Sequence, residues 1–203
     1  MPETISDKKQ LRRLQIEEAA LSLLAEKGYA QTSILMIAKR AKASNETLYN
    51  WYGDKLSLFR SLVARNADGV RDTLQAALGQ GTDPMQSLAR ISTLLLALLT
   101  GDRAIALNRA AAADGSGELG AAISEAGRDT ILPMIAQLLE RARDIGALGF
   151  DNTADAAELY LNLLIGDLQV RRMIGRLPAL SDEQIQTRAT RALHHLPILM
   201  PPA

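Results

Sequence analysis

The sequence predicts an all-α protein of about nine helices, and its composition and its periodicity both support this. Apolar residues make up 47% of the 203 residues and aromatic residues only 3%. Leu and Ala dominate and β-branched runs are nearly absent, a composition that favours helices over strands. Apolar positions return at helical spacing, and the sequence has no alternating strand pattern. A chain of this length can bury a core in one large domain or two small ones.

Helix caps and stop signals mark the first helices. We expect a helix over about 8–27, because apolar residues recur at helical spacing and Gly28 follows a basic last turn. Thr32 or Ser33 then caps a short helix. Ser44 caps a second short helix directly after it.

These two short helices, about 33–40 and 44–50, are joined by three residues and follow a longer helix. That is the plan of a helix-turn-helix motif, here over about 33–52. In such a motif the first short helix lies across the phosphate backbone. The second enters the major groove and presents its N-terminal side chains to base edges. The motif therefore predicts binding to double-stranded DNA.

A longer helical body follows the motif. Asp54 caps a long helix, and the segment 79–84, with two glycines and a proline, is the clearest linker. Further helices are expected at about 84–99, 102–113, 118–143, 153–175 and 182–196. We therefore divide the chain into an N-terminal DNA-binding domain, 1–55, and a C-terminal regulatory and dimerisation domain, 56–203, joined through the long helix.

Charge is distributed unevenly along the chain. The formal net charge is zero, but residues 1–65 hold eleven Lys or Arg and seven Asp or Glu, and the rest hold twelve and sixteen. All six lysines lie in the first 55 positions, and five of the seven aromatic residues lie in the first 60. A basic N-terminal module would attract DNA to one end of the molecule. Ordinary scatter of surface charge is the alternative explanation.

Several other classes of protein find no support. The chain has no cysteine, and its only histidines, His194 and His195, are adjacent, a poor spacing for a metal pair on a helix. Residues 115–120 match G-x-G-x-x-G but follow a helical stretch, so we interpret them as a loop. We expect no enzyme activity, cofactor or metal. The polar N-terminus and the short apolar run 94–99 predict a cytoplasmic protein without a membrane partner.

The stretch from Gly28 to Leu58, which contains the motif, resembles the DNA-binding region of the TetR (tetracycline repressor) family. The matching residues are Gly28-Tyr29, Thr32-Ser33-Ile34, Ile37-Ala38, Ala41, Ser44, Thr47-Leu48-Tyr49, Trp51-Tyr52, Lys55 and Leu58. They follow the family's order and spacing without a gap, from the first helix into the fourth. The resemblance implies a transcriptional regulator that binds a palindromic operator as a homodimer. It also implies repression that a small molecule relieves.

The resemblance also implies which residues contact DNA: Ser33, Ser44, Asn45, Glu46, Thr47, Tyr49, Asn50, Trp51 and Lys55. Asn45 can pair with adenine, and Glu46 can accept from cytosine N4. Ser44 caps the recognition helix, whose N-terminus favours a nearby phosphate, and Lys55 is expected on another phosphate.

Two features of this region depart from the family pattern or carry a second interpretation. The family often has a small or basic residue at Glu46, where an acid repels phosphate unless it reads a base; a solvated side chain is the alternative. Tyr52 stands where Phe is commoner. Leu48 and Tyr52 are assigned to the core and not to the contacts.

The C-terminal body resembles, more loosely, the regulatory domain of one broad branch of the family. The resemblance lies in Leu107-Asn108-Arg109 with the following residues to Asp114, Glu118-Leu119, Leu164-Ile165-Gly166-Asp167-Leu168, Arg171 and Gly175. It implies dimerisation and effector sensing. Independently, the helix 153–175 is apolar on more than one face, which predicts a homodimer through about 153–175 and 182–196. An ordinary monomer core is the alternative.

The effector is an unidentified small molecule. An aliphatic pocket is expected, with lining from Met85, Leu95, Leu99, Met134, Leu138 and Tyr160. Polar residues that can orient a ligand are Asn108, Arg109, Asn162 and Gln169, although pairing, capping or solvent contact is the commoner role of such side chains. Two functional alternatives stay open: an activator, and a small-molecule binding protein of the same fold without DNA affinity.

Overall fold

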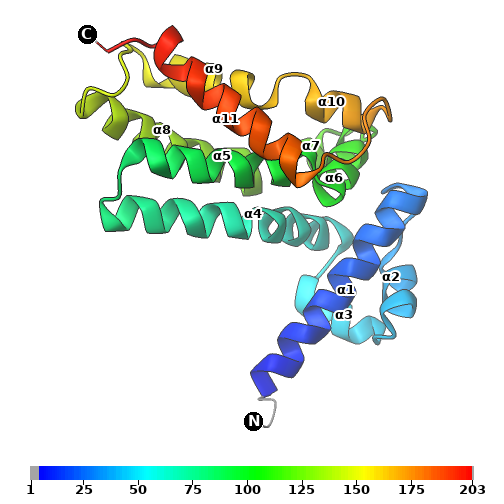
Figure 1. The fold of residues 1–203 in the computed structure, drawn as a ribbon. Helices are drawn as coiled ribbons and strands as arrows, with labels where there is room; N and C mark the ends of the chain where they lie inside the picture. The colour runs from blue at the N-terminus through cyan, green and yellow to red at the C-terminus, as the bar shows by residue number, and fades with distance from the viewer. Residues whose placement is uncertain (1–4, 203) are drawn as a thin grey trace. The chain divides into compact units, whose positions relative to one another are not determined.

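The computed structural model describes residues 5–202, and among them it contains helices and no strand. The all-α prediction is confirmed. The helices are α1 (Ile5–Lys27), α2 (Ile34–Ala41), α3 (Asn45–Tyr52), α4 (Lys55–Gln80), α5 (Pro84–Thr100), α6 (Asp102–Ala112), α7 (Glu118–Ile123), the π-helix η1 (Ser124–Arg128), α8 (Asp129–Asp144), α9 (Thr153–Ile165), α10 (Leu168–Met173) and α11 (Asp182–Leu199) (Figure 1).

The chain forms two compact units. The first is Met1–Arg65 with Ala106–Ile123, and the second is Asn66–Ile105 with Ser124–Ala203. Two helices, α4 and α6, therefore contribute residues to both units. The division into a DNA-binding domain and a regulatory domain at residue 55 concerns function and stays a prediction.

In the first unit, α2 packs against α1 and α3 packs against α2. The buried side chains of α1 recur at helical spacing and include Ile16, Ala20 and Leu23, so one face of this helix carries the core. Leu48 of α3 is completely buried. These apolar positions seat the two short helices on α1, since neither is long enough to be stable alone.

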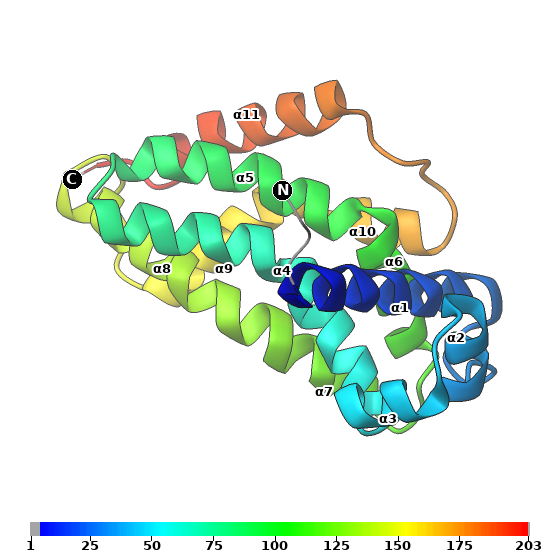
Figure 2. The ribbon, with the colours of Figure 1, turned by 90° about the horizontal axis from the view of Figure 1, so that it is seen from below.

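In the second unit, α11 packs on α5 and α9, and α8 packs on the same two helices. Figures 1 and 2 both show the later part of α4 running beside α5. The core is aliphatic and includes Leu88, Ile91, Leu96, Leu138 and Leu164, each fully buried. The chain end is anchored here as well, because the Gly149 N–H donates to the Met200 carbonyl at 3.0 Å.

Two long helices of the prediction are interrupted. The expected helix 118–143 consists of α7, η1 and α8. Pro133 has no N–H for the carbonyl four residues earlier, which disturbs the hydrogen-bond pattern at the start of α8. The expected helix 153–175 ends at Ile165, because Gly166 takes a φ of +52° that a continuing helix does not allow. A short α10 follows.

Two further features concern the described residues: a membrane-spanning helix and a metal site. None of their helices is both long and apolar enough to cross a membrane, although the bent pair α5 and α6 passes by length and composition when taken together. Within the same residues no group of three His, Cys, Asp or Glu side chains is placed to hold a metal ion. The glycine segment at 115–120 is a turn followed by the start of α7, as expected.

Candidate nucleic-acid interface

Serine caps set the starts of α2 and α3. The Ser33 hydroxyl accepts from the Met36 N–H at 3.3 Å, and the Ser44 hydroxyl accepts from the Thr47 N–H at 3.1 Å. Both caps satisfy N–H groups that the first turn of a helix leaves without a partner. The Ser44 and Thr47 hydroxyls also hydrogen-bond each other at 2.8 Å. These side chains therefore fix the local backbone, and a phosphate contact by Ser33, Ser44 or Thr47 stays a prediction.

The turn between the two helices is closed by a left-handed residue. Lys42 has a φ of +52° and is the only described non-glycine residue with positive φ. Its N–H donates to the Lys39 carbonyl at 3.2 Å, and the Ala43 N–H donates to the Ala38 carbonyl at 2.9 Å. These bonds end α2 within one residue and turn the chain directly into the α3 cap.

The recognition helix α3 has one buried side and one exposed side. Leu48 and Tyr52 are buried, as assigned from the sequence, and face the core of the first unit. Thr47 and Trp51 are half-buried. The remaining expected contact residues are exposed: Asn45, Glu46, Tyr49 and Asn50. Positions i, i+1, i+4 and i+5 share one face of a helix, so these four side chains form a single polar surface. We call it the reading face.

Lys55 lies where the sequence places it, at the start of α4, but its ammonium is already engaged. Its Nζ donates to the carbonyls of Tyr29 and Thr32, each at 3.0 Å, and lies 3.9 Å from the centroid of the Tyr29 ring. Burial lowers the pKa of Lys55. An ammonium has three N–H groups, so one remains for a phosphate. The side chain acts first as a brace for the turn before α2.

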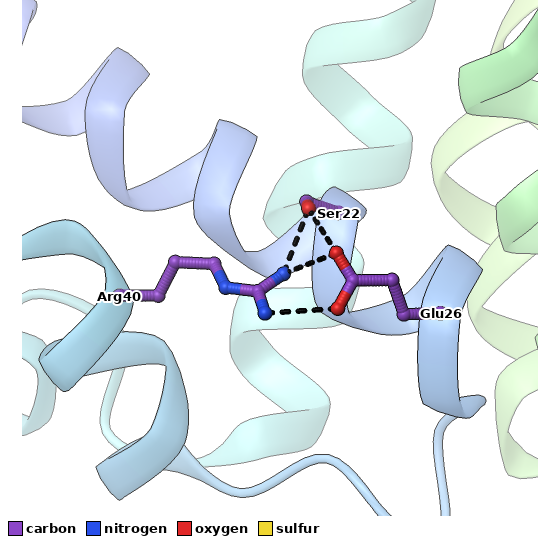
Figure 3. A network of polar contacts seen from close by, with 3 residues as sticks. All are labelled: Ser22, Glu26 and Arg40. Carbon is purple, nitrogen blue, oxygen red and sulfur yellow. Dashed lines mark hydrogen bonds and ion pairs between the residues drawn. The ribbon is translucent and has the colours of Figure 1, made fainter.

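A polar cluster fastens α2 to α1 (Figure 3). Arg40 donates to both carboxylate oxygens of Glu26, at 2.5 and 2.8 Å, and to the Ser22 hydroxyl at 2.8 Å. The Ser22 hydroxyl in turn donates to Glu26 at 2.9 Å. The bidentate geometry is the most specific one between Arg and a carboxylate. The hydrogen bonds from Arg40 lower the pKa of Glu26.

The sequence interpretation missed two basic residues of α1 that contact the motif. Arg12 donates to the Ala41 carbonyl at 3.0 Å and also to the Lys42 carbonyl, so it caps the end of α2. The Lys9 ammonium lies 5.9 Å from the centroid of the Trp51 ring, within the range of a cation–π contact. The sequence shows that both residues lie in a basic stretch at helical spacing. The groups that they contact come from distant parts of the chain, so only the tertiary structure reveals them.

The residues expected to line an effector pocket lie in the core of the second unit. Leu95, Leu138 and Tyr160 are buried, and the Tyr160 and Ser92 hydroxyls hydrogen-bond at 2.8 Å. Met85, Leu99 and Met134 pack against the same core. Gln169 donates to the Leu99 carbonyl at 3.0 Å, so its amide is paired.

An open groove of about 710 Å³ lies elsewhere in the second unit. It is lined by Asn66, Gly69, Val70, Thr73, Ala89, Arg90, Thr93, Leu94, Leu98 and Gln186, from α4, α5 and α11. The residues that we expected to line the effector pocket do not line this groove. The position of an effector site stays a prediction.

Known proteins match both parts of the chain. The family model of bacterial regulatory proteins of the tetR family matches residues 16–62, and that of the C-terminal domain of AefR-like transcriptional repressors matches residues 86–196. Among curated relatives, the fatty acid metabolism regulator protein of Bacillus subtilis is 26% identical over 99 residues, 49% of this chain and 51% of the relative. The HTH-type transcriptional regulator HbdR of Aromatoleum is 34% identical over 77 residues, 38% of this chain and 34% of the relative. The matches thus span about half or less of these relatives.

Solved structures match over nearly the whole chain. A TetR-family regulator from Mesorhizobium loti superposes with a TM-score of 0.75 at 23% identity, covering 97% of this chain and 98% of that one. The flavonoid-responsive regulator FrrA gives 0.67 at 26% identity, covering 96% and 100%. The regulator FadR of Bacillus subtilis, solved in complex with stearoyl-CoA, gives 0.73 at 19% identity, covering 90% and 96%.

The fold and the capped helix-turn-helix define a DNA-binding transcriptional regulator. The second family model alone covers more than half of the residues, and the chain belongs to the TetR family. The matched families and relatives are regulators of transcription and not enzymes.

Proposed function

We propose that the protein is a ligand-responsive repressor that binds a palindromic operator as a homodimer through the reading face of α3. The observation that carries this proposal is the single exposed polar face formed by Asn45, Glu46, Tyr49 and Asn50 on a helix whose other side is buried. Amide and carboxylate groups on such a face match base-edge donors and acceptors in the major groove. The similarity of residues 86–196 to the AefR-like repressors favours repression over activation.

A homodimer through α9 and the region up to Gly175, together with α11, is supported by apolar side chains that one chain leaves uncovered. Val170 is 53% exposed, Ile174 64% and Ile198 61%, and all three lie in or next to these helices. A dimer along these helices would cover such side chains, and apolar surface that a partner covers is typical of an interface. Twofold symmetry would repeat the reading face, so the operator should contain two inverted half-sites about 34–36 Å apart.

The effector class that we favour is an acyl-coenzyme A. A relative is named as a fatty acid metabolism regulator, and a protein of the same fold was solved with stearoyl-CoA. The core of the second unit is built from Leu, Ile and Ala, with Tyr160 as its one fully buried aromatic side chain among the described residues. An aliphatic interior suits an acyl chain better than a planar ring system. The flavonoid-responsive relative provides the competing class.

Release of DNA would follow from a shift between two conformations. An effector that binds more tightly to the conformation unable to seat both recognition helices lowers operator affinity by the ratio of its two affinities. By linkage, operator DNA lowers effector affinity by the same factor.

The test measures fluorescence anisotropy of a labelled operator duplex, obtained by selection from random DNA, with the full chain. The logarithm of the association constant should fall linearly with the logarithm of salt concentration, since phosphate contacts release counterions. Stearoyl-CoA should release the duplex, while free coenzyme A and quercetin should not. Absence of salt-dependent binding would favour a small-molecule binding protein of the same fold. Release by quercetin alone would reject the effector class, and tighter binding with stearoyl-CoA would reject its role as an inducer.

A further inference from the structure

A carboxylate lies buried beneath the recognition helix. Glu17 of α1 is 3% exposed and stands on the face that carries the buried Ile16 and Ala20. An ionised carboxyl group inside an apolar core costs free energy unless charged or hydrogen-bonding partners compensate for it. The role of Glu17 must therefore be sought in the partners that it holds.

Two of these partners come from different helices. The Tyr52 hydroxyl donates to Glu17 Oε1 at 3.4 Å, a long hydrogen bond, and Arg65 Nε lies 2.6 Å from Oε2. The contact with Arg65 is an ion pair without hydrogen-bond alignment, because Oε2 has no hydrogen-bond partner. Glu17 thus links α1 to the last residue of α3 and to α4.

The electrostatics of this site are dominated by burial. Burial raises the pKa of Glu17 against the opposing charges of Arg65 and Arg13 and the hydrogen bond from Tyr52. Burial and the neighbouring carboxylate also raise the pKa of Tyr52 to about 12. The tyrosine hydroxyl therefore keeps its proton near neutral pH and can donate it to the Glu17 carboxylate. At 3.4 Å the hydrogen bond from Tyr52 is weak by itself, so it constrains the end of α3 together with the ion pair that joins the same carboxyl group to Arg65 of α4.

The Tyr52 ring and hydroxyl have separable roles. The ring is buried, and a phenylalanine would bury the same surface without the hydroxyl. The hydroxyl is therefore not needed for packing. Asn45, the first residue of the reading face, lies seven residues before Tyr52 on the same two-turn helix. A small rotation of α3 at Tyr52 therefore shifts the Asn45 side chain relative to the base edge that it would contact.

We propose that Glu17, acting through the Tyr52 hydroxyl and Arg65, is a positioning residue that sets the orientation of α3 and thereby the preference for operator over unrelated DNA. This inference rests on the proposed function, because it needs α3 to read bases. Phosphate contacts tolerate a small rotation of the helix, whereas base-edge hydrogen bonds do not. The expected signature is a change in specificity and not in general DNA affinity.

The test uses Tyr52→Phe and Glu17→Gln in the full chain. The affinities for the selected operator and for an unrelated duplex of the same length are measured by anisotropy. Tyr52→Phe should lower the ratio of the two affinities about fivefold, the effect of one net hydrogen bond, with the unrelated duplex unaffected. Glu17→Gln should lower the ratio as well, since it removes the charge that faces Arg65 and weakens the acceptor of the Tyr52 hydroxyl. The loss in the double variant should be smaller than the sum of the two single losses, since both substitutions act on the same contact.

Thr100→Val is the matched control. It also removes one buried hydroxyl without changing the shape of the side chain, here one that donates to the Leu96 carbonyl at 2.7 Å, but it lies in the second unit. It should leave the ratio unchanged. Fluorescence of Trp51, the only tryptophan, reports whether the first unit is folded in each variant.

The outcomes separate this inference from the proposed function. If the wild type binds no duplex, the proposed function fails and this inference with it. If the wild type prefers its operator and both Tyr52→Phe and Glu17→Gln keep the ratio, the inference alone is overturned. A parallel loss of both affinities that follows the folded fraction would also overturn it, because Glu17 would then be only a structural residue.

Discussion

Lys42, the left-handed residue between α2 and α3, allows a sharp test of the turn. Replacement by glycine should stabilise the first unit at Lys42 and destabilise it at the nearby Lys39. Lys42 has a φ of +52°, a conformation that costs a residue with a side chain about 1–2 kcal/mol. Glycine adopts it freely but loses about 0.5–1 kcal/mol through the entropy of the unfolded chain. The hydrogen bonds described for this turn use backbone groups of Lys42 and its neighbours and the Arg12 side chain, but not the Lys42 side chain, so glycine keeps them. Lys42→Gly should therefore raise the free energy of unfolding of the first unit by about 0.5–1 kcal/mol.

Lys39→Gly is the matched control. Lys39 is also exposed and belongs to α2, so the change in charge is the same, but its backbone is helical. Glycine in a helix costs about 0.5–1 kcal/mol. The same replacement should therefore destabilise the unit at one lysine and stabilise it at the other.

Urea unfolding followed by Trp51 fluorescence measures both variants. With a dependence of about 2 kcal/mol per molar urea, the Lys42→Gly midpoint should rise by roughly 0.3–0.5 M, and the Lys39→Gly midpoint should fall by a similar amount. A fall in both midpoints would show that the turn is not strained at Lys42 and that the α2–α3 connection differs from the one described.

Three further predictions concern buried or half-buried positions. Leu48→Ala should lower the free energy of unfolding of the first unit by about 2–5 kcal/mol, seen as an earlier Trp51 transition, because Leu48 is fully buried; a loss below 1 kcal/mol would contradict the seating of α3. Gly149→Ala would place a Cβ 2.1 Å from the Pro201 carbonyl oxygen, so the two backbone segments must move apart. We expect faster hydrogen exchange of the amide at position 149 and a loss of about 1–3 kcal/mol in the free energy of unfolding. An exchange rate equal to that of the wild type would contradict the anchor at Met200. The pKa of Glu17 is raised in the folded protein above its ordinary value of 4.5. The stabilising contribution of this carboxyl group is therefore fully present below pH 4.5 and is lost as the pH rises through the pKa of the folded state. The wild type should thus gain stability relative to Glu17→Gln as the pH falls from neutral toward 4.5, and a constant difference would contradict the burial of this carboxyl.

Local signals in the sequence were enough to predict the helix-turn-helix. Ser33 and Ser44 cap α2 and α3 as expected, and the apolar spacing correctly assigned Leu48 and Tyr52 to the core. These features depend on neighbours within a few residues, which a single sequence displays directly.

The parts that were missed depend on tertiary contacts. The phosphate contact expected of Lys55 stays a prediction, but the sequence did not show that its ammonium also donates to the carbonyls of Tyr29 and Thr32. Arg12 meets the end of α2 almost thirty residues later, and Glu17 was not singled out because its partners lie on α3 and α4. A charged residue on an apolar face was the one local sign that a buried partner was needed.

The central claim is that the reading face of α3 contacts bases in two symmetric copies. Selection of bound sequences from random duplex DNA tests it most directly, carried out in parallel with the wild type and with Asn45→Ala. We expect an inverted repeat for the wild type, and for the variant the same repeat with preference relaxed at one base pair of each half-site. A wild-type site without twofold symmetry, or an Asn45→Ala site identical to that of the wild type, would contradict the claim.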